Sequence, residues 1–168
     1  MGLDVTAYST CAPQKLSGNS EYPSDEAYEK GLAYIHACNP WRERMDGLES
    51  GAYSYDTKHS FRAGSYSGYN AWREYLAALI GRRPEELWYA ENPEGPFAEL
   101  ISFSDCEGVI GPKTSAKLLV DFVEFDARAR EFAAEKLRDG HPEWFVRVYD
   151  DFKKAFSLAA DGGFVLFH

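Results

Sequence analysis

The chain has 168 residues, a length typical of one domain, and a formal net charge of −9 from 27 Asp and Glu against 18 Lys and Arg. This charge repels nucleic-acid phosphates, and no run of Lys or Arg forms a basic patch, so the sequence predicts no nucleic-acid partner. No apolar run approaches the ~20 residues of a membrane helix, and the start lacks the pattern of a signal peptide, so we expect no membrane contact.

The cysteines indicate the compartment. Cys11, Cys38 and Cys106 are odd in number and widely spaced, and they form no CxxC pair. Free thiols are typical of a reducing compartment, and we therefore expect a soluble, cytoplasmic protein.

The first part of the chain predicts short strands joined by loops, because apolar and polar residues alternate there between turn-forming residues. In chain order these elements are a strand over 2–9, a loop over 10–26, a strand over 31–37, and strands over 50–55 and 59–63 that are placed to pair with each other. The strand over 2–9 would bury Leu3, Val5 and Ala7 on one face. The segment 27–38 also fits a helix, and we favour the strand because Gly31 weakens a helix.

The second part predicts helices, because apolar residues recur there at spacings of three and four. In chain order the elements are a helix over 66–80 ended by Gly81, a helical turn over 85–89, a short helix over 96–103 opened by Pro96, a loop over 104–111, a long helix over 112–137, a helix over 143–160 and a strand over 164–167. The stripe of the helix over 66–80 consists of Tyr69, Trp72, Leu76, Leu79 and Ile80.

Strands at both ends and helices in the second half are typical of the α+β class. We expect residues 1–168 to form a single globular domain. In it, a small antiparallel sheet that includes both termini packs against a helical layer. The two long helices are separated by a short break, so they predict one antiparallel pair in that layer.

The first polar segment, residues 62–73, surrounds the start of a predicted helix. Its candidate ligand-binding residues are Arg62, Ser65, Tyr66, Tyr69 and Arg73. The two arginines could clamp a carboxylate or phosphate, the two tyrosines could stack on a ring, and the serine could cap the helix or bind an oxyanion. The alternative is a capped helix start after a tight turn, with Arg73 solvated.

The second polar segment, residues 104–115, precedes the long helix and contributes Asp105, Cys106, Glu107 and Lys113 as candidates. Its two carboxylates resemble half of a hard-cation site, but the remaining oxygen ligands are missing. Cys106 is a candidate nucleophile if the fold brings a histidine close, although a lone cysteine is more often a small buried residue.

Three further residue groups bear on these candidate sites. The histidines that could serve Cys106 are His36, His59 and His168. Lys113 lies at a helix N-terminus, where anions bind readily, but capping by Thr114 or Ser115 explains those hydroxyls equally well. His36 and Cys38 would share one face of a strand, but zinc needs three or four ligands, so we predict no metal site.

Three stretches carry a resemblance to known proteins. They are residues 1–8 (MGLDVTAY), 61–73 (FRAGSYSGYNAWR) and 103–108 (FSDCEG), the last followed by Ile110-Gly111. Together they resemble a family of bacterial, prophage and tailed-phage proteins with no assigned activity. The resemblance implies a bacterial or phage cytoplasmic setting and no particular catalytic residue or cofactor. Two of the three stretches coincide with the two polar segments.

Both polar segments place flexible backbone and reactive groups just before a rigid helix, where functional residues commonly lie. We therefore predict that segments 62–73 and 104–115 face each other and form the polar cleft of a module that binds a ligand or a protein partner. The alternative is a small hydrolase or group transferase for an anionic small molecule, with Asp105 or Glu107 as the acid–base group and Cys106 as the nucleophile. An acidic decoy of DNA is disfavoured because the acidic residues are scattered over all segments.

Overall fold

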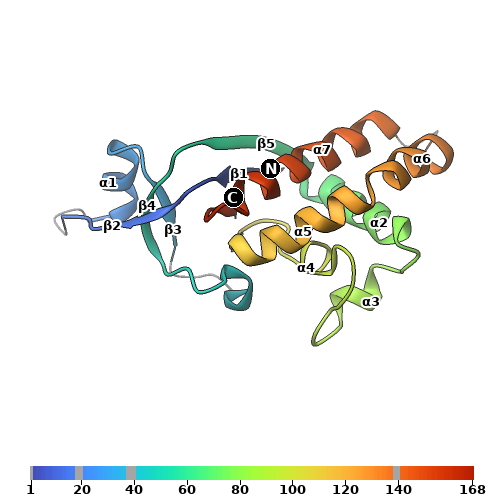
Figure 1. Ribbon diagram of the computed structural model, residues 1–168, viewed down its shortest axis with the longest axis horizontal. Coiled ribbons are helices and arrows are strands. Elements are labelled where there is room, and N and C mark those ends of the chain that lie inside the picture. The colour runs from blue at the N-terminus through green and yellow to red at the C-terminus, as the bar shows by residue number, and fades with distance from the viewer. Residues whose placement is uncertain (1, 18–20, 37–40, 138–140) are drawn as a thin grey trace.

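The computed structural model describes residues 2–17, 21–36, 41–137 and 141–168, and it has the α+β architecture that the sequence predicts (Figure 1). Sheet A has the strand order β5-β1-β7-β6 and contains β1 (Gly2–Tyr8), β5 (Lys58–Ser65), β6 (Gly108–Ile110) and β7 (Phe164–Phe167). Sheet B has the order β2-β4-β3 and contains β2 (Ala12–Gln14), β3 (Ala33–Ile35) and β4 (Gly51–Ser54). All strand pairs are antiparallel.

The helices of the described residues lie mostly in the second half of the chain. In chain order they are α1 (Pro23–Glu29), a 3-10 helix η1 (Arg42–Met45), α2 (Tyr66–Leu79), α3 (Glu85–Trp88), α4 (Ala98–Ile101), α5 (Pro112–Glu124), α6 (Asp126–Lys136) and α7 (Pro142–Ala159). Figure 1 shows α7 running back along α5 in the opposite direction, which confirms an antiparallel pair.

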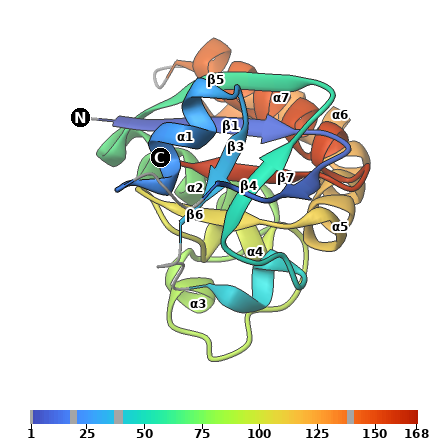
Figure 2. The same ribbon diagram turned by 90° about the vertical axis from the view of Figure 1, so that its left-hand side faces the viewer.

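The two faces of sheet A have different neighbours. One face carries Leu3, Val5 and Ala7, all fully buried against a core that includes Trp72 of α2 and Phe152 of α7. Sheet B crosses in front of the other face, as Figure 2 shows. A second, smaller apolar cluster lies between the two sheets and contains Ala33, Ile35, Met45, Tyr53, Val109 and Phe164. Sheet A is therefore covered by helices on one face and only partly by sheet B on the other.

Most elements with a clear periodic pattern are confirmed. They are β1, β4, β7, α2, α3 and α7. Gly81 follows the end of α2 with a φ of +73°, a conformation that suits glycine. The ambiguous segment 27–38 divides into the end of α1 and the strand β3, so each interpretation holds for one part of it. Residues 37–40, which include Cys38, lie outside the described residues.

Both predicted loops are wrong in part. The segment 10–26 contains β2 and the first turn of α1, and the segment 104–111 contains β6. The two strands have only three residues each, and they exist because they pair with β4 and β7, which come from distant parts of the chain. A run of three residues carries too little periodicity to predict such long-range pairing.

The predicted pairing of strands 50–55 and 59–63 is also wrong. β4 belongs to sheet B, whereas β5 belongs to sheet A and pairs with β1. The chain passes from one sheet to the other near Asp56 and Thr57, whose backbone groups bond with Ser9 where β1 has ended. Both strands have the expected alternation, but alternation does not specify the partner strand.

Two helix boundaries differ from the prediction. The helix expected over 112–137 is divided into α5 and α6 at Phe125, although the backbone hydrogen bonds to and from Phe125 continue on either side. The buried stripe runs through the junction from Phe122 to Ala129, so the periodicity does not reveal the break. The short helix α4 begins only after Phe97, which has a φ of +56°, and so Pro96 does not open it.

Across the described ranges, no helix has both the length and the apolar character needed to cross a membrane.

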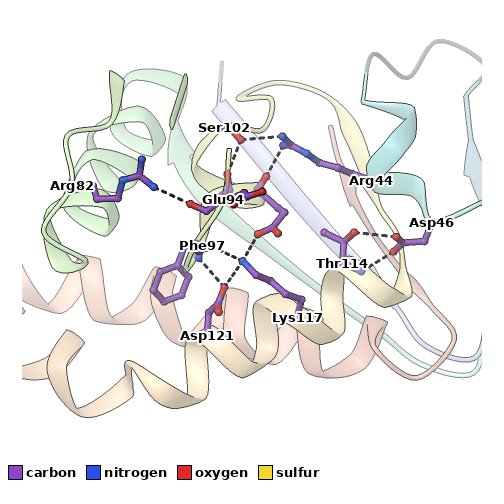
Figure 3. A network of polar contacts seen from close by, with 12 residues as sticks. Arg44, Asp46, Arg82, Glu94, Phe97, Ser102, Thr114, Lys117 and Asp121 are labelled. Atoms are coloured by element: carbon purple, nitrogen blue, oxygen red, sulfur yellow. Dashed lines mark hydrogen bonds and ion pairs between the residues drawn. The ribbon is translucent and has the colours of Figure 1, made fainter. Parts of the chain in front are cut away.

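A network of polar contacts fastens the connection between α3 and α5 onto α5 (Figure 3). The buried Asp121 carboxylate accepts a hydrogen bond from the backbone N of Phe97 at 2.8 Å, and Lys117 Nζ lies 3.0 Å from the same carboxylate. Arg44 donates to the backbone O of Glu99 at 2.6 Å. The contact with Asp121 fixes the backbone N–H of Phe97, the residue whose φ is +56°.

Replacing Asp121 with alanine is expected to lower the free energy of unfolding by about 2 kcal/mol, because the buried N–H of Phe97 loses its acceptor. Urea denaturation measures this change. The matched control is Asp150→Ala, which removes an exposed carboxylate paired with Arg130 and is expected to cost less than about 1 kcal/mol. Equal losses in the two variants would contradict the role of Asp121.

Candidate functional site

The two polar segments meet in the structure. Asn70 of α2 donates a hydrogen bond from Nδ2 to Asp105 Oδ2 at 2.8 Å. Three residues further along α2, Arg73 donates to the backbone O of Ile101 at 2.9 Å and to the backbone O of Phe103. The connection from α4 to β6 therefore lies directly against the first two turns of α2.

A hollow of about 540 Å³, which we call the Cys106 hollow, begins at the residue after Asp105. It is lined by His36, Tyr66, Cys106, Glu107, Gly108, Val109, Leu166, Phe167 and His168. These residues come from the end of β3, the start of α2, β6 and its approach, and the end of β7. Figure 2 shows β3 passing in front of β7 toward β6, at the same end of sheet A as the C-terminus. The hollow is thus built by four segments that are distant in the sequence.

The lining of the Cys106 hollow combines an apolar floor with a titratable rim. The floor is formed by Val109, Leu166 and Phe167, which belong to the edge strand β6 of sheet A and to its neighbour β7. The rim is formed by Cys106, Glu107, His36, His168 and the ring of Tyr66. Its lining includes neither lysine nor arginine, and Glu107 contributes a carboxylate to it.

His168 is held in place by its neighbours on sheet A. Its backbone N and O both bond with Asp4, each at 2.9 Å. Its ring Nε2 lies 3.1 Å from Thr6 Oγ1, and the Thr6 hydroxyl also lies 3.0 Å from Ser60 Oγ. A hydroxyl at hydrogen-bonding distance from one ring nitrogen fixes the orientation of an imidazole. The His168 ring is therefore oriented at the wall of the hollow by Thr6.

Cys106 lies in a turn organised by Ser104. The buried Ser104 Oγ accepts hydrogen bonds from the backbone N of Cys106 at 3.2 Å and of Glu107 at 3.0 Å. The same hydroxyl lies 3.5 Å from Cys106 Sγ. Because the oxygen already accepts two N–H groups, its proton is directed to the sulfur. The Cys106 side chain itself is exposed at the rim, contrary to the alternative of a small buried residue.

Tyr69 and Arg73 were expected in a ligand-binding cleft, but both belong to the core. Tyr69 is 0% exposed, and burial raises the pKa of its hydroxyl far above the usual range. Arg73 is 7% exposed, binds Asn70 Oδ1 and backbone carbonyls, and packs its guanidinium over the rings of Tyr69 and Trp88. Arg73 is therefore placed neither as a ligand clamp nor as a solvated side chain, and both interpretations are corrected. Its hydrogen bonds instead hold α2 against the connection that carries Cys106.

Arg62 and Ser65 are also bound by neighbours. Arg62 is exposed on β5 and pairs with Asp4 on β1 at 3.2 Å, which places it on the open face of sheet A and outside the hollow's lining. Ser65 caps α2, with its Oγ accepting a hydrogen bond from the backbone N of Gly68 at 3.1 Å. The helix-capping interpretation of Ser65 is confirmed.

Lys113 lies in the first turn of α5, where anion binding and side-chain capping were the two interpretations, and the carboxylate of Asp46 occupies that place. Asp46 accepts hydrogen bonds from the backbone N of Thr114 at 2.8 Å and from Thr114 Oγ1 at 3.1 Å (Figure 3). Capping of α5 by the Thr114 or Ser115 side chain is therefore wrong: Asp46 does it from outside the helix, and Ser115 is fully buried. Lys113 is exposed and does not line the hollow.

The three histidines considered for Cys106 are separated by the fold. His36 and His168 line the Cys106 hollow, whereas His59 lies on β5 with its Nε2 3.4 Å from Asp151 of α7. Burial lowers the pKa of His59, Lys154 lowers it further, and Asp151 opposes the shift. Within the described part of the chain, no three His, Cys, Asp or Glu side chains are placed to hold a metal ion.

Two other hollows are weaker candidates. One, of about 490 Å³, is lined by Asn70, Arg73, Glu74, Trp88, Ser102 and Phe103. The other, of about 630 Å³, is a shallow groove between α6 and α7, where Arg130 pairs with Asp150 and Arg147 with Asp151. The charged groups of both hollows are largely taken up by neighbouring residues, in contrast to the rim of the Cys106 hollow.

No model of a known protein family, no curated protein and no solved structure matches this chain. The assignment of a function therefore depends on the geometry of the Cys106 hollow.

Proposed function

We propose that this chain is a binding module and that the Cys106 hollow takes a small ligand, or a single side chain of a partner, that is neutral or positively charged. The observation that carries the proposal is the hollow's composition: an apolar floor, the Tyr66 ring and the Glu107 carboxylate, with neither lysine nor arginine in the lining. Binding sites of this kind are concave and mostly apolar, with a few polar groups that set orientation.

The charge of the rim selects the class of ligand. A cationic ligand gains from the Glu107 carboxylate and from the face of Tyr66. An anionic ligand is opposed by Glu107, and the arginines expected to clamp it are engaged elsewhere, Arg62 with Asp4 and Arg73 with backbone carbonyls. These contacts disfavour the alternative of a small enzyme for an anionic molecule.

Three probes of equal size test this proposal: benzylamine, benzyl alcohol and benzoate. We expect saturable shifts of the amide NMR signals of Tyr66, Glu107 and His168 with dissociation constants in the millimolar range, near −4 kcal/mol. Benzylamine should bind about fivefold more tightly than benzyl alcohol, corresponding to about 1 kcal/mol for an exposed ion pair. Benzoate should bind more weakly than both.

Two variants separate the ion pair from general effects. Glu107→Gln should remove the difference between benzylamine and benzyl alcohol. Glu124→Gln, a neutralisation of an exposed carboxylate on α5, should leave it unchanged. Binding of benzoate as tight as that of benzylamine would overturn the charge preference. An absence of saturable shifts with all three probes would overturn the binding function.

A further inference from the structure

We propose that two copies of this chain associate through α5, with the two α5 helices packed side by side in opposite directions. The starting observation is a pair of valines on the outer side of this helix. Val120 is 61% exposed and Val123 is 58% exposed, and the other large apolar side chains exposed in the described chain are three tyrosines. This surface does not line the Cys106 hollow, so the inference is independent of the proposed binding function.

The solvent-facing side of α5 is apolar, which is unusual for an outer helix. The exposed residues Ala116, Val120, Val123 and Ala127 follow one another at spacings of four, three and four, so they form one stripe along α5 and the start of α6. The buried Leu118 lies on the opposite side. The exposed positions of α7, by contrast, are all polar or charged: Glu143, Arg147, Asp150, Lys154 and Ser157. An apolar stripe on the outer side of a helix indicates a surface that a partner covers.

Ion pairs within the chain border this stripe on both sides. α7 packs along one side of α5, and α4 lies on another (Figure 1). Toward α4, the ammonium group of Lys117 is paired with the carboxylate of Asp121 at 3.0 Å. Toward α7, Lys153 Nζ lies 2.9 Å from Asp126 Oδ1. Since these charges are already paired, a partner that approaches between them meets the apolar stripe.

Two other charges on this side of α5 indicate what the partner is. Lys113 and Glu124 are both exposed, and within the described part of the chain neither forms an ion pair. They are eleven residues apart, close to three helical turns, and therefore lie on the same side of the helix. When a second copy packs in the opposite direction, Lys113 lies beside Glu124 of the second copy, and the two-fold symmetry repeats this contact. A second copy thus supplies a charge complementary to each of these residues.

The same two-fold axis fits the apolar contacts. Placed near Val120, it sets Ala116 against Val123 of the second copy and brings Val120 beside its own counterpart. The small side chain of Ala116 lets the helix axes approach to the usual separation of about 8–10 Å. A parallel pair would instead place Lys113 beside Lys113 and Glu124 beside Glu124 of the second copy, which is repulsive at both ends. The antiparallel arrangement is therefore favoured.

The association should be weak. The stripe consists of small and medium side chains, and contacts of this size belong to the low end of specific interfaces, below about 1,200 Å². The net charge of −9 on each copy also opposes association, although exposed charges more than about 8 Å apart are largely screened at physiological ionic strength. We therefore expect a dissociation constant of about 100 µM.

Sedimentation equilibrium of the whole chain, from about 10 µM to about 1 mM, measures this constant. Val120→Glu should weaken self-association at least about tenfold, because it places an unpaired charge in the contact. Its urea midpoint should stay that of the original chain, since residue 120 is exposed in a single copy. Ala78→Glu adds the same charge at an exposed position of α2 and should leave the constant unchanged. A chain that remains monomeric at the highest concentration contradicts the inference, as does a Val120→Glu variant that dimerises normally.

Charge reversals test the direction of the pair. Lys113→Glu and Glu124→Lys should each weaken self-association about fivefold, because each places like charges beside each other at both ends. Glu124→Lys also makes the chain less negative, so its weakening cannot come from net repulsion. An equal mixture of the two variants should recover the original affinity, because every contact of the mixed pair again joins opposite charges. Unchanged self-association of both single variants, together with a mixture that associates more tightly than the original chain, would indicate a parallel pair and refute the arrangement.

Discussion

Replacing Arg73 with alanine is expected to lower the free energy of unfolding by about 4 kcal/mol, the largest loss we expect from a single polar side chain of this protein. Its guanidinium is 7% exposed and donates to the backbone carbonyls of Ile101 and Phe103. Alanine would leave the Phe103 carbonyl without this donor, would leave the Ile101 carbonyl with Trp88 Nε1 as its side-chain donor, and would open a cavity beneath the rings of Tyr69 and Trp88. Urea denaturation, followed by tryptophan fluorescence, measures the loss.

Two further variants make this result specific. Arg73→Lys should recover part of the loss, because an ammonium can bind one of the carbonyls but cannot reproduce the planar fork. Arg62→Ala removes an exposed arginine paired with Asp4 and should cost less than about 1 kcal/mol. If Arg73→Ala were as mild as Arg62→Ala, the core position of Arg73 would be incorrect, and the expected role as a ligand clamp would again be open.

The spacing of Arg73 along the sequence indicates that it is buried, whereas its charge alone suggests an exposed side chain. Arg73 is four residues after Tyr69 and three before Leu76, so it falls on the buried stripe of α2. An arginine on an apolar stripe indicates a structural contact with backbone carbonyls as readily as a ligand site. By contrast, Tyr66 lies at the first position of the helix, where a side chain reaches the Cys106 hollow.

The elements that the sequence predicts well are those whose pattern is local. β1, α2 and α7 each repeat their apolar period several times, and their helix or strand type follows from that repetition alone. β2 and β6 have three residues and are stabilised by partners more than 35 residues away. No local pattern specifies that pairing, and so these strands were expected to be loops.

The candidate site likewise has a part that the sequence predicts and a part that it does not. The two polar segments were expected to face each other, and the contact between Asn70 and Asp105 brings them together. Three of the hollow's residues, Val109, Leu166 and Phe167, have no feature that distinguishes them from other core residues in the sequence. They reach the site because the edge strand β6 pairs with β7 in sheet A. A pattern of polar residues can therefore indicate where a site lies, whereas the apolar residues of its floor are set by which strands pair in the sheet.

Gly163→Ala is expected to lower the free energy of unfolding by more than about 3 kcal/mol, because a side chain cannot fit between α7 and β1. An added Cβ at Gly163 would lie 1.8 Å from the backbone O of Tyr8 and 3.0 Å from Cα of Ser9. The obstacle is backbone and not the end of a flexible side chain. The substitution must therefore move the end of β1 away from the start of β7, where Tyr8 pairs with Phe164.

The neighbouring Gly162 is the matched control. It has a φ of +65°, and an added Cβ there would meet no atom within 4 Å. Gly162→Ala should therefore cost only the strain of a left-handed residue, about 1 kcal/mol. Urea denaturation measures the free energy of unfolding of both variants. It thereby compares the cost of a steric clash at Gly163 with the cost of a left-handed conformation at Gly162. Because His168 directly follows β7, a folded fraction of Gly163→Ala should show weaker binding of benzylamine, whereas Gly162→Ala should bind it normally. Similar stability losses in the two variants would contradict the close approach of β1 and β7 at this turn.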